Sequence, residues 1–208
     1  MKNFIAALVL LLVSVGCNNA RRTLPYYDSA DFTPRWELPA NGKMHSIRPF
    51  VLTDQANETV TERDLTGKIA VVSFFFASCP DVCPITIRSM LDLQQRFEEA
   101  PDVVLFSHSV TPRRDSVPVL RAFAEETGVN AARWKLLTGP ENEIYDLGRN
   151  FYFVEDNQGS APNDSLFTHT ENLVLLDRQR RLRGIYNGMD PNGMRSLVRD
   201  ITLLRAER

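Results

Sequence analysis

An apolar run at residues 69–76, interrupted only by Ser73, is followed three positions later by Cys79 and then by Cys83. A run of this kind predicts a central strand that is buried on both faces of a sheet. The next segment, residues 84–99, has proline near its start and apolar residues at helical spacing, which predicts an amphipathic helix. We therefore expect both thiols at a strand-to-helix junction, where the helix dipole lowers a thiol pKa.

The rest of the chain alternates between predicted strands and helices. The pattern predicts a small hairpin at 50–53 and 59–61, a strand at 103–110, helices at 116–127 and 141–148, a second hairpin at 171–177 and 182–186, and a closing helix at 191–205. This order predicts the α/β class and a thioredoxin-like fold with an N-terminal hairpin extension and loop insertions. Residues 155–165 are rich in Asn, Asp, Gly, Ser and Pro, and we expect them to form a mobile surface loop.

The N-terminus predicts export from the cytoplasm. Lys2 precedes an apolar stretch at residues 4–15, which is too short for a mature membrane span and has the length of a signal-peptide core. Because a small residue and then Cys17 follow this core, we expect residues 1–16 to be a lipoprotein signal peptide and Cys17 to be lipidated. The mature protein would then be a membrane-anchored lipoprotein of the cell envelope. A plain signal peptide with an incidental cysteine is the alternative.

The mature chain would have 208 − 16 = 192 residues, which suits one domain and a tether. We expect a lipidated arm at 17–48 and the thioredoxin-like domain at 49–208. The arm contains three prolines and no sustained periodicity, so it is expected to be a spacer that is ordered only near the domain, with Trp36 docked onto the domain. The net charge of −2 gives no reason to expect a nucleic-acid partner.

Only three cysteines are present, and lipidation of Cys17 leaves the pair Cys79 and Cys83 for chemistry. A disulfide between thiols four positions apart closes a very small loop and stabilises little, so the pair is expected to act as a redox couple or to bind a soft metal ion. His169 could add an imidazole ligand or could be a strand-edge histidine bonded to backbone. His108 could be an auxiliary group or a buried core residue.

Several blocks of the sequence resemble the Sco/SenC family of copper-handling proteins. They are the Cys-x-x-x-Cys-Pro segment at 74–84 and the segments 109–115, 134–139, 169–170 and 173–177, in this order. The resemblance spans residues 49–204. It implies that Cys79, Cys83 and His169 bind one copper ion per chain, as Cu⁺ or Cu²⁺.

The resemblance also implies a function. The chain would be an extracytoplasmic copper metallochaperone that delivers copper, or reduces acceptor thiols, during assembly of the binuclear copper centre of cytochrome c oxidase. Its partners would be the copper-accepting subunit of a respiratory oxidase, a thiol reductant, and the membrane through the lipid anchor. Two positions depart from the family pattern, because Thr111 replaces an acidic residue and Thr170 replaces serine.

The alternative function is a metal-independent thiol–disulfide oxidoreductase of the cell envelope. Thioredoxin-like enzymes of that class usually place a cis-proline opposite their thiols, just before a strand. The corresponding residues here, 167–170, contain no proline and include His169 instead. This difference favours metal binding, although the thiols must still be reduced before they can bind copper.

Overall fold

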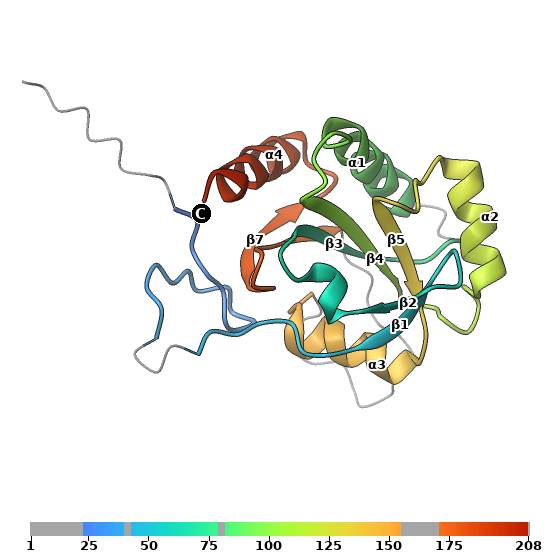
Figure 1. Cartoon of the computed structure of the whole chain (residues 1–208), viewed down its shortest axis with the longest axis horizontal. Helices are drawn as coiled ribbons and strands as arrows, with labels where there is room; N and C mark the ends of the chain where they lie inside the picture. Colours follow the sequence, from blue (N-terminus) through green and yellow to red (C-terminus); the bar gives the residue numbers. More distant parts are fainter. Residues whose placement is uncertain (1–22, 40–42, 79–81, 155–170, 208) are drawn as a thin grey trace, which may run out of the picture.

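The computed structural model describes residues 23–39, 43–78, 82–154 and 171–207, which form one mixed sheet with helices on both faces (Figure 1). The strand order is β2-β1-β5-β4-β3-β6-β7. The strands are β1 (Val51–Asp54), β2 (Thr59–Thr61), β3 (Ile69–Phe75), β4 (Val103–Ser109), β5 (Trp134–Thr138), β6 (Asn172–Leu176) and β7 (Leu182–Asn187). The helices are η1 (Glu62–Leu65), α1 (Val82–Arg96), α2 (Val117–Thr127), α3 (Glu141–Asp146), η2 (Leu147–Phe151) and α4 (Pro191–Ala206).

Strand β3 lies in the middle of the sheet, parallel to β4 and antiparallel to β6. All seven of its residues are buried, which confirms the predicted central strand. Side chains on a strand alternate between faces. Ile69, Val71 and Phe75 therefore join the core beneath α1, α2 and α4, whereas Ala70, Val72 and Phe74 join the core on the α3 side. Figure 1 shows α1 and α4 on one side of the sheet and α3 on the other.

The predicted α/β class and the N-terminal hairpin, which is the pair β1 and β2, are confirmed. The predicted loop at 155–165 lies outside the described residues. Within the described ranges, no helix combines the length and the apolar character that crossing a bilayer requires.

Strand β5 is the element that the sequence patterns missed. It pairs with β4 on one side and with β1 on the other, and thereby joins the hairpin to the parallel strands. Buried Gln55 fixes its start, because the Gln55 side chain donates to the carbonyl of Trp134 and accepts from the amide of Leu136, both at 2.8 Å. A five-residue strand that includes Lys135 has too short a pattern to identify from sequence.

Three helix boundaries differ from the prediction by two residues or more, and one of them is the end of α1, which lies at Arg96 instead of residue 99. Helix α1 begins at Val82, two residues before Pro84, because the amides of a first helical turn need no intrahelical partner and proline is tolerated there. The helix predicted to end at Gly148 continues as the wide π turn η2 and ends at Phe151. Such π turns arise from tertiary packing and leave no simple sequence pattern.

The first described residues, 23–39, lie against the edge strand β7. Leu24 is buried, and the amide of Tyr27 donates to the carbonyl of Leu182 at 3.1 Å. The arm was expected to be ordered only near the domain, and residues 23–39 of it lie directly against the domain. The expected docking of Trp36 is wrong, because its side chain is 63% exposed. The domain boundary at residue 49 stays a prediction.

His108 is a core residue in β4, with 0% exposure and rings of Phe50, Phe74 and Tyr152 around it. Neither ring nitrogen of His108, nor the hydroxyl of Tyr152, has a hydrogen-bond partner among the described residues. Burial lowers the pKa of His108 to about 3, because desolvation disfavours the charged imidazolium. The core alternative for His108 is therefore confirmed.

Replacing His108 with phenylalanine is expected to stabilise the fold by about 1–3 kcal/mol at neutral pH, because two buried nitrogens without partners are removed. The gain should grow as the pH falls from about 6.5 towards 3, because the unfolded histidine takes up a proton that the folded one refuses. Urea unfolding at several pH values measures both effects. His45→Phe is the control and should give no gain, because the Nε2 atom of His45 is 2.8 Å from the carbonyl of Phe151. Equal stability of His108→Phe and the wild type at every pH would contradict this prediction.

Candidate thiol site at the end of β3

The two predicted site cysteines belong to residues 76–83, here called the thiol segment, which lead from β3 into the first turn of α1. Ala77 and Ser78 form a turn after β3, and Cys83 is the second residue of α1. A position in the first turn is one where the helix dipole favours a thiolate, and no acidic residue lies in that turn. Cys79 lies outside the described residues, as does Cys17. The backbone position of Cys83 thus agrees with the predicted junction, while the pairing of the two thiols stays a prediction.

Asp115 anchors the start of this segment. Its side chain is 1% exposed, and one of its oxygens, Oδ2, accepts three hydrogen bonds. The donors are the amide of Ala77 at 3.2 Å, the hydroxyl of Ser109 at 2.6 Å and the hydroxyl of Thr111 at 3.1 Å. Hydrogen bonds to an ionised acceptor are the strong kind. The buried carboxylate therefore ties the turn before the thiols to the end of β4.

The same contacts explain how the chain accommodates Thr111 where the family pattern has an acid. The Thr111 hydroxyl donates to Asp115, and its amide donates to the Ser109 hydroxyl at 3.1 Å. An aspartate at this position would place a second carboxylate beside a buried one, and two like charges repel each other. Threonine instead supplies a hydrogen-bond donor. The role of Asp115 was not predicted from the sequence, although a serine and an aspartate close to the end of a buried strand were the available signal.

The third predicted ligand, His169, lies outside the described residues. The chain re-enters the described part at Glu171 and continues into β6, which runs antiparallel to β3. The first residues of β6 therefore lie at the sheet edge where β3 ends. His169 is three positions before Asn172 in the sequence, and Asn172 lies at the sheet edge where β3 ends.

A second set of contacts connects α1 to this chain. The hydroxyl of Ser89, on α1, donates to the carbonyl of Gly188 at 2.7 Å. The amide of Gly188 donates in turn to the carbonyl of Glu171 at 2.8 Å. A Cβ on Gly188 would lie 3.0 Å from that carbonyl, closer than is usual, so glycine fits this close approach. Gly188 thus links α1 to Glu171, the first described residue after the gap at 155–170.

Next to the thiol segment, a groove of about 350 Å³ separates α1 from α2. Ala77 and Pro84 border it at one end, and Leu91 and Phe123 contribute apolar surface. Across the parts of the chain that the structure describes, no three His, Cys, Asp or Glu side chains are grouped so as to hold a metal ion. Cys79 and His169 lie outside those parts, and the ligand set that includes them stays a prediction.

These features define a class. A central parallel strand that leads through a Cys-x-x-x-Cys segment into a helix, with further strands antiparallel on either side, is the arrangement of a thioredoxin-like thiol protein. The comparison with protein families is more specific, because the SCO1/SenC family model matches residues 39–202. The chain belongs to the SCO1/SenC family.

Relatives and solved structures agree with this assignment. Protein SenC of Rhodobacter capsulatus is 28% identical over 176 residues, covering 83% of this chain and 77% of SenC. The crystal structure of a SCO1/SenC family lipoprotein from Bacillus anthracis is 28% identical, with a TM-score of 0.68, and the match covers 77% of this chain and 95% of that one. Arabidopsis thaliana ScoI, solved with copper bound, is 25% identical, with a TM-score of 0.58 and coverages of 74% and 97%. The predicted thioredoxin-like fold is thereby confirmed.

Replacing Asp115 with alanine is expected to loosen the thiol segment, because three donors lose their shared acceptor. We expect a loss of about 2–4 kcal/mol in global stability and at least about tenfold faster hydrogen exchange at Ala77 under native conditions. Thr111→Val is the matched control, because it removes one donor to the same oxygen and leaves the Ala77 bond in place. Unchanged exchange at Ala77 in Asp115→Ala would show that the carboxylate does not hold this segment.

Proposed function

We propose that this protein is an extracytoplasmic copper metallochaperone. One copper ion, as Cu⁺ or Cu²⁺, is its cargo, and Cys79, Cys83 and His169 are the ligands. Thiolates suit the soft Cu⁺ ion, and an imidazole completes a three-coordinate set that also serves Cu²⁺. The observation that carries the proposal is the shared sheet edge, where the segment with both thiols leaves β3 and the chain that follows His169 enters β6. The copper-bound Arabidopsis relative supports the choice of metal.

We further propose that the copper is delivered during assembly of the binuclear copper centre of cytochrome c oxidase, with the copper-accepting oxidase subunit as the partner. A thiol reductant would first open a Cys79–Cys83 disulfide by supplying two electrons and two protons, which yields two thiols. Binding of copper then displaces the thiol protons. The groove between α1 and α2 borders the thiol segment, and it offers the partner a surface next to the cargo.

The proposed attachment is a lipid on Cys17, with residues 1–16 removed, so that the mature protein is held to a membrane of the cell envelope. The lipoprotein among the solved relatives supports this part of the proposal.

The copper stoichiometry tests the ligand set. The reduced domain without its leader should bind one Cu⁺ ion in competition with a chromogenic chelator. Cys79→Ala or Cys83→Ala should each weaken Cu⁺ binding by more than about a hundredfold, and His169→Ala should weaken it less, because thiolates dominate the binding of a soft ion. His45→Ala serves as the matched histidine control and should bind like the wild type. A stoichiometry well below one, or unchanged affinity in Cys83→Ala, would overturn the ligand assignment.

The second candidate function is a metal-independent thiol–disulfide oxidoreductase, and the thioredoxin-like fold with its pair of cysteines favours it. A deletion strain grown at low copper separates the two functions. Disulfide exchange does not require His169. If the function is disulfide exchange, the His169→Ala protein should restore oxidase activity to the deletion strain. If the function is copper delivery, it should fail to do so. His45→Ala should rescue in either case, and Cys79→Ser in neither. Full rescue by His169→Ala would favour the oxidoreductase.

A further inference from the structure

Residues 23–39, here called the arm segment, are fixed to the domain by backbone pairing. The amide of Tyr26 donates to the carbonyl of Arg35 at 2.7 Å, and the amide of Arg35 donates back at 2.9 Å. A salt bridge of 2.6 Å between Arg35 and Asp28 closes the same turn of chain. Tyr27 pairs with Leu182, so the arm segment continues the sheet beyond β7.

Buried Arg183 binds the backbone of the arm segment. Its guanidinium donates to the carbonyls of Leu24 at 2.8 Å and Pro25 at 3.1 Å, and it lies 4.3 Å from the centre of the Tyr26 ring. The charge of Arg183 is balanced by Asp177 at 3.2 Å and by Glu207 at 3.0 Å. The arm segment therefore has a defined face towards the domain and a defined face away from it.

Two large apolar side chains lie on the surface of this fixed segment. Trp36 is 63% exposed and Leu38 is 51% exposed. Tryptophan is enriched where protein meets the membrane–water interface, because its ring is apolar and its N–H is polar. Single exposed apolar residues are common on protein surfaces, so exposure alone indicates no function for Trp36 and Leu38. Their position in the molecule is the informative observation.

That location is next to the proposed lipid anchor. Six residues, 18–23, separate Cys17 from buried Leu24, so the two residues can be at most about 25 Å apart when the chain between them is fully extended. A lipid on Cys17 would thus keep Leu24, at the start of the arm segment, within about 25 Å of the bilayer. The charged residues of the arm segment are Asp28, Asp31, Arg35 and Glu37, which sum to −2, so attraction to an anionic surface is not what would hold it there.

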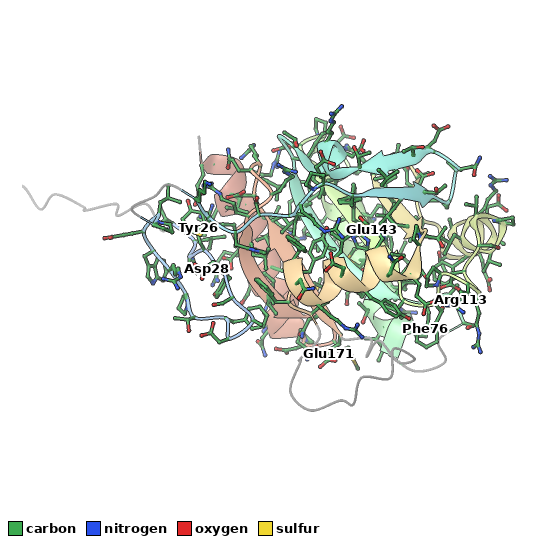
Figure 2. The ribbon with its side chains drawn as sticks, turned by 90° about the horizontal axis from the view of Figure 1, so that it is seen from below. Tyr26, Asp28, Phe76, Arg113, Glu143 and Glu171 are labelled. Atoms are coloured by element: carbon green, nitrogen blue, oxygen red, sulfur yellow. The ribbon has the colours of Figure 1, made fainter. Side chains whose placement is uncertain are left out.

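We propose that the arm segment is a membrane-contact surface whose Trp36 and Leu38 enter the interface of a phospholipid bilayer. The proposal rests on the lipid anchor proposed at Cys17. The contact would orient the domain as well as tether it. Figure 2 shows Tyr26 and Asp28 of the arm segment at the opposite end of the molecule from Phe76 and Arg113. Phe76 directly follows β3 and precedes both thiols in the sequence, and Arg113 follows β4. A bilayer under the arm segment would thus leave the thiol edge open to a partner.

Tryptophan fluorescence of the full lipoprotein in vesicles tests the contact. The chain has two tryptophans, and Trp134 is buried, so Trp36→Phe isolates the signal of Trp36 by difference. In phosphatidylcholine vesicles with bromine on the acyl chains, Trp36 emission should shift to the blue and fall about twofold relative to unbrominated vesicles. The Trp36→Phe protein should show neither change, and Leu38→Ser should weaken both. High salt should leave the quenching intact, because charge does not drive the contact.

The outcomes separate the two proposals. Unquenched Trp36 emission at the wavelength of exposed tryptophan, in protein whose N-terminal peptide mass shows the lipid, would overturn the membrane contact and leave the anchor standing. A blue shift without quenching would also overturn it, because Trp36 would then be covered by protein. Quenching of Trp36 in protein whose mass shows no lipid would uphold the contact and overturn the anchor.

Discussion

Burial of β3 on both faces is the constraint on which the rest of the structure depends. A strand whose seven residues are all inaccessible to water must lie between two other strands and beneath helices on each side. Its neighbours β4 and β6 satisfy the backbone, and the two core clusters cover its alternating side chains. The chain can emerge only at the carboxyl end of the strand, and the thiol segment begins there.

The place where the chain leaves the sheet does not by itself fix the conformation of the turn that follows. The buried carboxylate of Asp115 adds that constraint. It draws the amide of Ala77 to the end of β4 through an oxygen shared with Ser109 and Thr111. On the far side of the segment, Ser89 and Gly188 connect α1 to Glu171. Ala77, helix α1 and Glu171 are thus attached to one framework that consists of the sheet and α1. A metal ion that prefers few ligands binds better when the surrounding contacts hold the backbone that carries those ligands in place.

The sequence predicted those parts of the fold whose signals are local and strongly periodic. The run that became β3, the helix that became α1 and the N-terminal hairpin all follow from hydrophobic spacing and turn residues. Strand β5 was missed because it is short, includes Lys135 and is held at its start by Gln55, 79 positions from Trp134. The docking of the arm segment depends on Arg183, which lies 159 positions from Leu24, so no local pattern could show it. For the candidate site, the ligand residues stay a prediction from the sequence, whereas the support from Asp115 could be found only from the fold.

X-ray absorption of the Cu⁺-loaded protein measures the ligands of the metal directly and so tests the central claim that Cys79, Cys83 and His169 bind copper. We expect two sulfur atoms and one imidazole nitrogen bound to copper. The nitrogen contribution should be lost in His169→Ala and retained in His45→Ala. A shell of nitrogen and oxygen atoms alone, or an identical spectrum in His169→Ala, would contradict that claim.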